Sequence, residues 1–249
     1  MVVVALALVL AAGCGGSGNA GELARLRELA GSGAADCRPA PDYARPQYIV
    51  GYGSFLQRAS RTRTMPTVVT VLPIELRGFR RGFFFERQSP GFRTAFLGAV
   101  VDPSGSFNVV LFPVDEPDLV ASDARESSYC RASVSPSDIT VPSGSAPDAS
   151  SQIWIYVNPP DTIGLPSNDS PIVQSYVDIF LSGCLEIEEE YSLTGFADRC
   201  IDTTTDWSKH WVNDRIAPRR PVAEQPRANQ IDTMLAARLP AEFAAIRIE

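Results

Sequence analysis

The residues best suited to chemistry lie in two short stretches that are far apart in the sequence. Residues 48–55 read as an apolar strand that runs into a turn, where Gly53 lacks a Cβ and lets a ligand approach main-chain N–H groups. Residues 122–129 place the carboxylate of Glu126 beside Arg125. A partly buried carboxylate can take a proton from a substrate and return it. The simpler alternatives are an ordinary strand end and a surface ion pair.

The types and order of these stretches resemble a known family. A strand ending in Tyr52-Gly53-Ser54, followed after a run of strands by D-x-R-E-x-x-Y at residues 123–129, resembles the γ-glutamylcyclotransferase superfamily. The R-G-F-R-R segment at residues 77–81 and the W-x-x-H-W-x-x-D-R pattern at residues 207–215 are similar to further segments of that superfamily. The resemblance covers approximately residues 47–221.

The resemblance implies an enzyme that cyclises its substrate. In a γ-glutamyl amide, the substrate's own α-amine can attack the γ-carbonyl, which closes the lactam 5-oxoproline and releases the amine. Because the substrate supplies the nucleophile, the protein has only to fold the substrate and move protons. Glu126 is the implied general acid/base. The implied substrate-binding residues are Tyr52, Gly53, Ser54, Phe55, Tyr129 and Tyr156.

The implied partner is a small γ-glutamyl compound, such as glutathione or a γ-glutamyl peptide, and no metal or organic cofactor is expected. Two alternatives stay open. One is a related cyclising or acyl-transfer activity on a different γ-glutamyl amine. The other is a lipid-anchored binding or structural protein that keeps the fold without turnover. A Ser-His or Cys-His mechanism would have to use His210, the single histidine, and no G-x-S-x-G motif accompanies it.

The N-terminus indicates export. Residues 2–12 form an unbroken apolar run, too short for a membrane-spanning helix, which needs about 20 residues, and typical of a signal-peptide core. Small residues then lead to Cys14, as in a bacterial lipobox. We therefore expect a lipoprotein anchored to the bacterial cell envelope through a lipid on Cys14, with no other membrane contact.

Composition limits the other function classes. The 249-residue chain has a net charge of -7, so it lacks the basic excess on which nucleic-acid binding relies. Besides Cys14 there are four cysteines, Cys37, Cys130, Cys184 and Cys200, which permit two disulfides in three connectivities. The pair Cys184–Cys200 is the first candidate. The alternative is that these cysteines are free and buried as small apolar residues.

Closely spaced strands dominate the central part of the chain. Apolar, β-branched or aromatic runs occur at residues 68–76, 79–86, 94–101, 107–114 and 153–157, and residues 102–105 read as a hairpin turn. Apolar residues at helical spacing from Val173 to Ile187 predict a core helix. We expect an α+β fold with a small mixed or antiparallel β-barrel flanked by helices, as in the superfamily.

The expected domain organisation has four parts. Residues 1–13 are the signal peptide, and residues 14–46 are the lipidated cysteine and a linker rich in Gly, Ala and Pro. Residues 47–221 form the γ-glutamylcyclotransferase-like domain, and residues 222–249 form a C-terminal helical tail.

Overall fold

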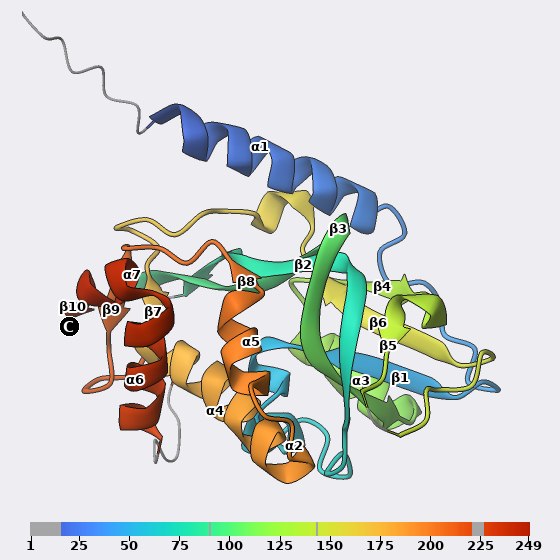
Figure 1. Cartoon of the computed structure of the whole chain (residues 1–249). Helices are drawn as coiled ribbons and strands as arrows, with labels where there is room; N and C mark the ends of the chain where they lie inside the picture. The colour runs from blue at the N-terminus through green and yellow to red at the C-terminus, as the bar shows by residue number, and fades with distance from the viewer. Residues whose placement is uncertain (1–15, 90, 143, 221–226) are drawn as a thin grey trace, which may run out of the picture.

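The computed structural model describes residues 16–89, 91–142, 144–220 and 227–249. The predicted signal peptide and Cys14 lie outside the described residues. Helices surround one mixed β-sheet, with α1 on one side and α4, α5 and α6 on another (Figure 1). The predicted α+β class, with a mixed sheet flanked by helices, is confirmed.

Two long antiparallel strands form the frame of the sheet. Strand β2 (Leu72–Ser89) pairs with β3 (Phe92–Val114) along nearly its whole length. The predicted hairpin turn at residues 102–105 is therefore wrong. The strands stay paired on both sides of it, and the extra residues of β3 are accommodated as an irregularity opposite Gly78, whose φ is +80°. A side chain at Gly105 would collide with the Phe79 carbonyl oxygen, at 2.2 Å.

The remaining strands extend this frame on both sides. Strand β1 (Gln47–Gly51) lies between β3, to which it is antiparallel, and β6 (Gln152–Val157), to which it is parallel, and β4 (Cys130–Val134) pairs with β6. Strand β5 (Ile139–Thr140) pairs with β2 and follows β4 after the short 3-10 turn η2 (Pro136–Asp138). Among the described residues no ladder joins β4 to β5, so the strand pairing does not close into a barrel. The other short strands are β7 (Ile172–Val173), β8 (Thr204–Thr205), β9 (Trp211–Asn213) and β10 (Arg247–Ile248).

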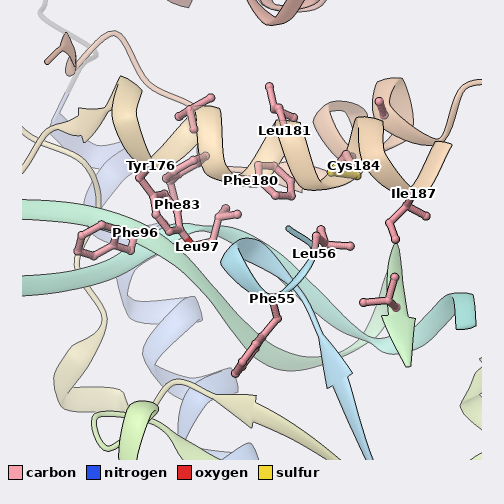
Figure 2. Close-up of a cluster of buried hydrophobic side chains, with 14 of the residues drawn as sticks. Phe55, Leu56, Phe83, Phe96, Leu97, Tyr176, Phe180, Leu181, Cys184 and Ile187 are labelled. Atoms are coloured by element: carbon pink, nitrogen blue, oxygen red, sulfur yellow. A yellow bond between two sulfur atoms is a disulfide. The ribbon is translucent and has the colours of Figure 1, made fainter. Parts of the chain in front are cut away.

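Helix α4 (Gln174–Tyr191) occupies the predicted core position. Its residues from Gln174 to Leu185 are all buried, because the sheet and turn η1 (Gly53–Phe55) cover one side of the helix while α5 (Phe196–Asp202) and α6 (Ala228–Arg238) cover the other. Figure 2 shows its side chains packed over the strands and the η1 segment. The labelled residues of this cluster are Phe55, Leu56, Phe83, Phe96, Leu97, Tyr176, Phe180, Leu181, Cys184 and Ile187.

The segment interpreted from the sequence as a linker is part of the folded structure where it is described. Helix α1 (Gly16–Gly33) lies across the sheet (Figure 1), and Leu26 and Ala30 are fully buried in a cluster with Phe84 of β2. Cys37 forms a disulfide with Cys130, the first residue of β4. Composition suggested a linker because glycine and alanine are common here, but apolar residues on one face of the helix bury against the sheet.

The C-terminal segment contains helix α6 and the short helix α7 (Pro240–Ala244), and it ends in β10, which pairs with β9. A second disulfide joins Cys184 of α4 to Cys200 of α5, as the sequence suggested. Among the described residues no helix has the length and apolar character needed to cross a bilayer.

Candidate active site

The residues predicted to do chemistry meet at one cavity of about 260 Å³. Its lining includes these predicted site residues: Tyr52, Ser54, Phe55, Glu126, Tyr129 and Tyr156. Gly53 is in the same turn but does not line the cavity. The structure therefore brings the two stretches together, although the long strands β2 and β3 separate them in sequence. The roles assigned to these residues stay predictions.

Glu126 is placed by the end of helix α3 (Glu116–Arg125). The helix is capped at its start by Asp115, whose side chain accepts a hydrogen bond from the Asp118 amide, and at its end by Glu126, whose amide donates to the Ser122 carbonyl at 2.8 Å. The Glu126 side chain is 17% exposed, and burial raises the pKa of its carboxyl above the ordinary value. The guanidinium groups of Arg125, Arg220 and Arg87 oppose that rise in pKa.

Arg125 links Glu126 to the glycine turn. Its Nε lies 3.1 Å from Glu126 Oε1, and its Nη2 donates to the Ser54 hydroxyl at 2.9 Å. Its Nη1 donates to the Ser60 carbonyl at 2.8 Å, which ties the same guanidinium to helix α2 (Arg58–Thr62). The guanidinium also lies over the Phe55 ring, 4.2 Å from the centroid. This planar group fixes the carboxylate and the turn relative to each other.

The turn η1 contains the left-handed backbone conformation that a glycine in a tight turn allows. Gly53 has φ +57°, and a side chain there would meet the Tyr176 hydroxyl at 2.7 Å. Helix α4 approaches the residues after η1 closely at Gly183, where an added Cβ would lie 2.3 Å from the Gln57 amide nitrogen. From another side, the buried guanidinium of Arg61 donates to the Phe55 carbonyl at 2.8 Å. The turn is thus held rigidly at the cavity wall.

The cavity tyrosines are joined to the protein by their hydroxyls. Tyr52 donates to the Tyr156 carbonyl at 2.6 Å, Tyr156 donates to Asp123 Oδ1 at 2.8 Å, and Tyr129 donates to the Leu97 carbonyl at 3.1 Å. Burial raises the pKa of Tyr52, Tyr129 and Tyr156, so all three remain protonated near neutral pH. The three tyrosines line the cavity as neutral side chains, whereas Glu126 is its carboxylate.

Sequence reasoning missed about half of the lining. The residues not predicted as site residues are Phe85, Arg87, Phe96, Leu97, Tyr176 and Arg220, together with Arg125 and Ser128, which flank predicted ones. Tyr176 sits within the periodic pattern of α4, where it could not be distinguished from a core residue. Arg220 is positioned by a chain of bonds: its amide donates to the Ser175 hydroxyl, which donates to the buried carboxylate of Asp214. No local pattern reveals such a placement.

The arrangement is suited to acid–base chemistry. Within the described ranges, no group of histidine, cysteine, aspartate and glutamate side chains is arranged to hold a metal ion. His210 does not line this cavity, and its Nδ1 lies 3.0 Å from Asn168 Oδ1. The carboxylate in the cavity lining is that of Glu126, and three arginines, Arg87, Arg125 and Arg220, lie around it.

Comparison with known proteins supports the fold. No protein-family model matches the chain, and no curated protein sequence matches it significantly. Among solved structures, a γ-glutamyl cyclotransferase is similar with a TM-score of 0.50 at 13% identity, over 76% of this chain and 99% of that one. An uncharacterized human protein has a TM-score of 0.48 at 13% identity, over 66% and 92% of the two chains. A yeast γ-glutamyl cyclotransferase specific to glutathione has a TM-score of 0.41 at 10% identity, over 64% and 95%.

The first of these likenesses shows that the chain has the fold of a γ-glutamyl cyclotransferase. At 13% identity this likeness shows the fold alone.

Proposed function

We propose that this protein cyclises a γ-glutamyl amide to 5-oxoproline and releases the amine. The observation that carries the proposal is the shared cavity of Glu126 and the η1 turn, with Arg125 bonded to both. The fold of a γ-glutamyl cyclotransferase supports the same reaction class.

The reaction needs a folded substrate and one proton carrier. The cavity walls hold the glutamyl chain so that its α-amine faces its γ-carbonyl, which replaces a bimolecular encounter by an intramolecular one. Glu126 takes a proton from the α-ammonium, and the free amine attacks the γ-carbonyl to form the C–N bond of the lactam. The same carboxyl group passes this proton to the departing nitrogen as the amide C–N bond breaks, and it relays the second proton, which the lactam nitrogen loses, to the released amine. No group is left covalently attached to the protein.

The η1 turn provides the polar contacts of the substrate. The amide of Ser54, which lines the cavity, belongs to the start of a 3-10 turn, where backbone N–H groups have no partner within the turn. We assign it to the substrate's α-carboxylate or to the oxyanion that develops on the γ-carbonyl. Ser54 also presents a hydroxyl whose position is fixed by Arg125.

The experiment is an assay of 5-oxoproline. The purified protein, without residues 1–13, is incubated with glutathione and with a panel of γ-glutamyl amino acids. We expect product from at least one of them, and a loss of about 10²-fold or more in Glu126→Gln, the usual contribution of general acid–base catalysis. Equal rates for the two proteins would remove Glu126 from the mechanism. Substrate binding without any product would favour a binding protein that has lost turnover.

We also propose that the protein is exported and lipidated at Cys14. The apolar run at residues 2–12 and the small residues before Cys14 support this, as do two disulfides, which persist in oxidising compartments. In a bacterial host, the full chain should fractionate with membranes and release from them with detergent. Cys14→Ser should abolish lipid incorporation. Incorporation equal to that of the unchanged chain would refute the assignment.

A further inference from the structure

A segment that does not line the cavity holds the loop of residues 126–129, which carries Glu126. Residues 34–46 connect α1 to β1, and within them Arg38 adopts a left-handed backbone, φ +63°, which is uncommon outside glycine. The Arg38 amide donates to the Arg131 carbonyl at 3.0 Å. The neighbouring residue, Cys37, is covalently bonded to Cys130. Arg38 is therefore fastened to the start of β4, directly after the loop in question.

The guanidinium of Arg38 donates hydrogen bonds to three carbonyls at and just after the end of α3. Its Nη1 donates to the Asp123 carbonyl at 3.0 Å, and its Nη2 donates to the carbonyls of Glu126 at 2.8 Å and Tyr129 at 3.1 Å. The last carbonyls of a helix have no partner within the helix, and a cation there also opposes the negative end of the helix dipole. The backbone of Glu126 is thus held through a side chain that does not line the cavity.

Two further bonds brace the same loop. The side chain of Arg131 pairs with the Asp123 carboxylate and also donates to the Pro39 carbonyl at 2.7 Å. Asp123 in turn accepts the hydroxyl of Tyr156 at 2.8 Å, and Tyr156 is a wall of the cavity. The bracing thus connects residues 38 and 39 to the loop and to the cavity wall.

We propose that Arg38, fastened by the Cys37–Cys130 disulfide, is a positioning residue that sets the place and the burial of the Glu126 carboxyl. This inference rests on the proposed function for its kinetic consequence, but its structural claim concerns Glu126 alone. Loss of the three carbonyl bonds lets the loop move and admits water to the carboxyl. A displacement of about 1 Å can cost up to about 10²-fold in rate.

The test compares Arg38→Met and Arg38→Lys with a matched control, Arg45→Met. Arg45 lies in the same segment, but its guanidinium donates to the Ser150 and Ser151 carbonyls, away from Glu126. We expect Arg38→Met to lower kcat by about 10-fold or more with a smaller change in KM. Arg38→Lys, which keeps the charge, should recover part of kcat, and Arg45→Met should leave it unchanged.

The chain also offers a matched pair of disulfide variants. The double replacement Cys37→Ser with Cys130→Ser should lower kcat in the same way as Arg38→Met. Removing the other disulfide, by Cys184→Ser with Cys200→Ser, should lower the melting temperature without that selective loss of kcat. If both double variants lose kcat in proportion to lost stability, the disulfide has no positioning role.

A readout independent of turnover separates this inference from the proposed function. Carbon-13 NMR of the glutamate carboxyls, with the Glu126 signal assigned by its absence in Glu126→Gln, gives the pKa of Glu126 directly. In Arg38→Met this pKa should move back toward that of an ordinary glutamate, because the carboxyl becomes hydrated. A shift of the pKa with no product from the unchanged protein would overturn the function alone. Unchanged kcat and unchanged pKa in Arg38→Met would overturn the positioning role.

Discussion

Two arginines packed against aromatic rings, the fully buried Arg81 and the partly buried Arg125, differ in what they face. Both guanidinium groups lie over aromatic rings, and burial lowers the pKa of both, that of Arg81 to about 9. Arg81 is sealed in the core between Phe107 and Phe180. Arg125 lines a cavity and pairs with the carboxylate of Glu126.

The partners of the two cations explain the difference. Among the described residues, Arg81 donates to neutral oxygens alone, which include the Thr204 hydroxyl and the carbonyls of Asn108 and Cys200, each at 2.9 Å. A cation satisfied in this way joins strands β2 and β3 to α5, and its side chain is fully buried. Beside Arg125, a carboxylate with a raised pKa opens into a cavity. Arg81 therefore belongs to a structural site and Arg125 to a candidate chemical site. The feature that distinguishes them is the carboxylate of Glu126, which opens into a cavity beside Arg125.

The largest expected effect is a loss of activity without a loss of fold when Glu126 is replaced. Glu126→Gln should lower kcat/KM by about 10²–10⁴-fold while the protein stays folded, because the amide cannot carry the proton. Steady-state kinetics with circular dichroism checks both. A loss of fold in this variant would make Glu126 a structural residue like Arg81 and would break the comparison.

Glu126→Gln should also change how the stability of the protein depends on pH. Because the pKa of Glu126 is raised by folding, the unfolded chain loses this proton at lower pH than the folded protein. The free energy of unfolding therefore falls as the pH rises from about 4.5 through the folded pKa. Glu126→Gln should lack this contribution and gain stability relative to the unchanged protein over that pH range. Urea titrations at several pH values measure the difference.

At the sealed site the expected effect is reversed. Arg81→Met should lower the free energy of unfolding by about 3 kcal/mol or more, since it leaves several buried acceptors without donors at about 1–3 kcal/mol each. The kcat/KM per folded molecule should change by less than about twofold. Chemical denaturation and an assay normalised to folded protein give the two numbers. A variant that is as stable as the unchanged protein but inactive would contradict the structural assignment.

A smaller effect is expected from the other arginines that line the cavity. Arg87 and Arg220 line it together with Arg125, and Arg220 also lies over the Phe96 ring at 5.4 Å. This excess of positive charge favours a leaving amine that carries a carboxylate. Arg220→Gln should reduce the preference for γ-glutamylglycine over γ-glutamylmethylamide by about 3–10-fold.

The exposed Arg77, which bonds the Ser137 carbonyl, provides the control for this prediction. Arg77→Gln should leave the preference between the two substrates unchanged. An Arg220→Gln variant with an unaltered preference would mean that the leaving amine does not reach Arg220.

The sequence predicted features that are encoded locally. The glycine turn, the D-x-R-E segment and the apolar period of α4 each carry their own pattern, and each is found where it was expected. Residues placed by long-range contacts escaped prediction. Arg87 reaches the cavity through the register of β2 with β3, and Arg220 through the Asp214 anchor.

The errors have a similar origin. Residues 102–105 have the composition of a hairpin turn, but they interrupt a strand that remains paired on both sides. Arg38 carried no signal, because its importance comes from a disulfide partner and from carbonyls of a helix far along the chain. Local composition cannot report a contact whose other half is distant in sequence.

The most direct test compares two pH titrations of the same protein. Carbon-13 NMR follows the Glu126 carboxyl, while steady-state kinetics follows kcat/KM for release of 5-oxoproline. We predict that kcat/KM rises with pH through a midpoint that coincides with the pKa of Glu126, and that this midpoint lies above the ordinary glutamate value of 4.5. A Glu126 pKa at or below 4.5, or a kinetic midpoint that persists unchanged in Glu126→Gln, would contradict it.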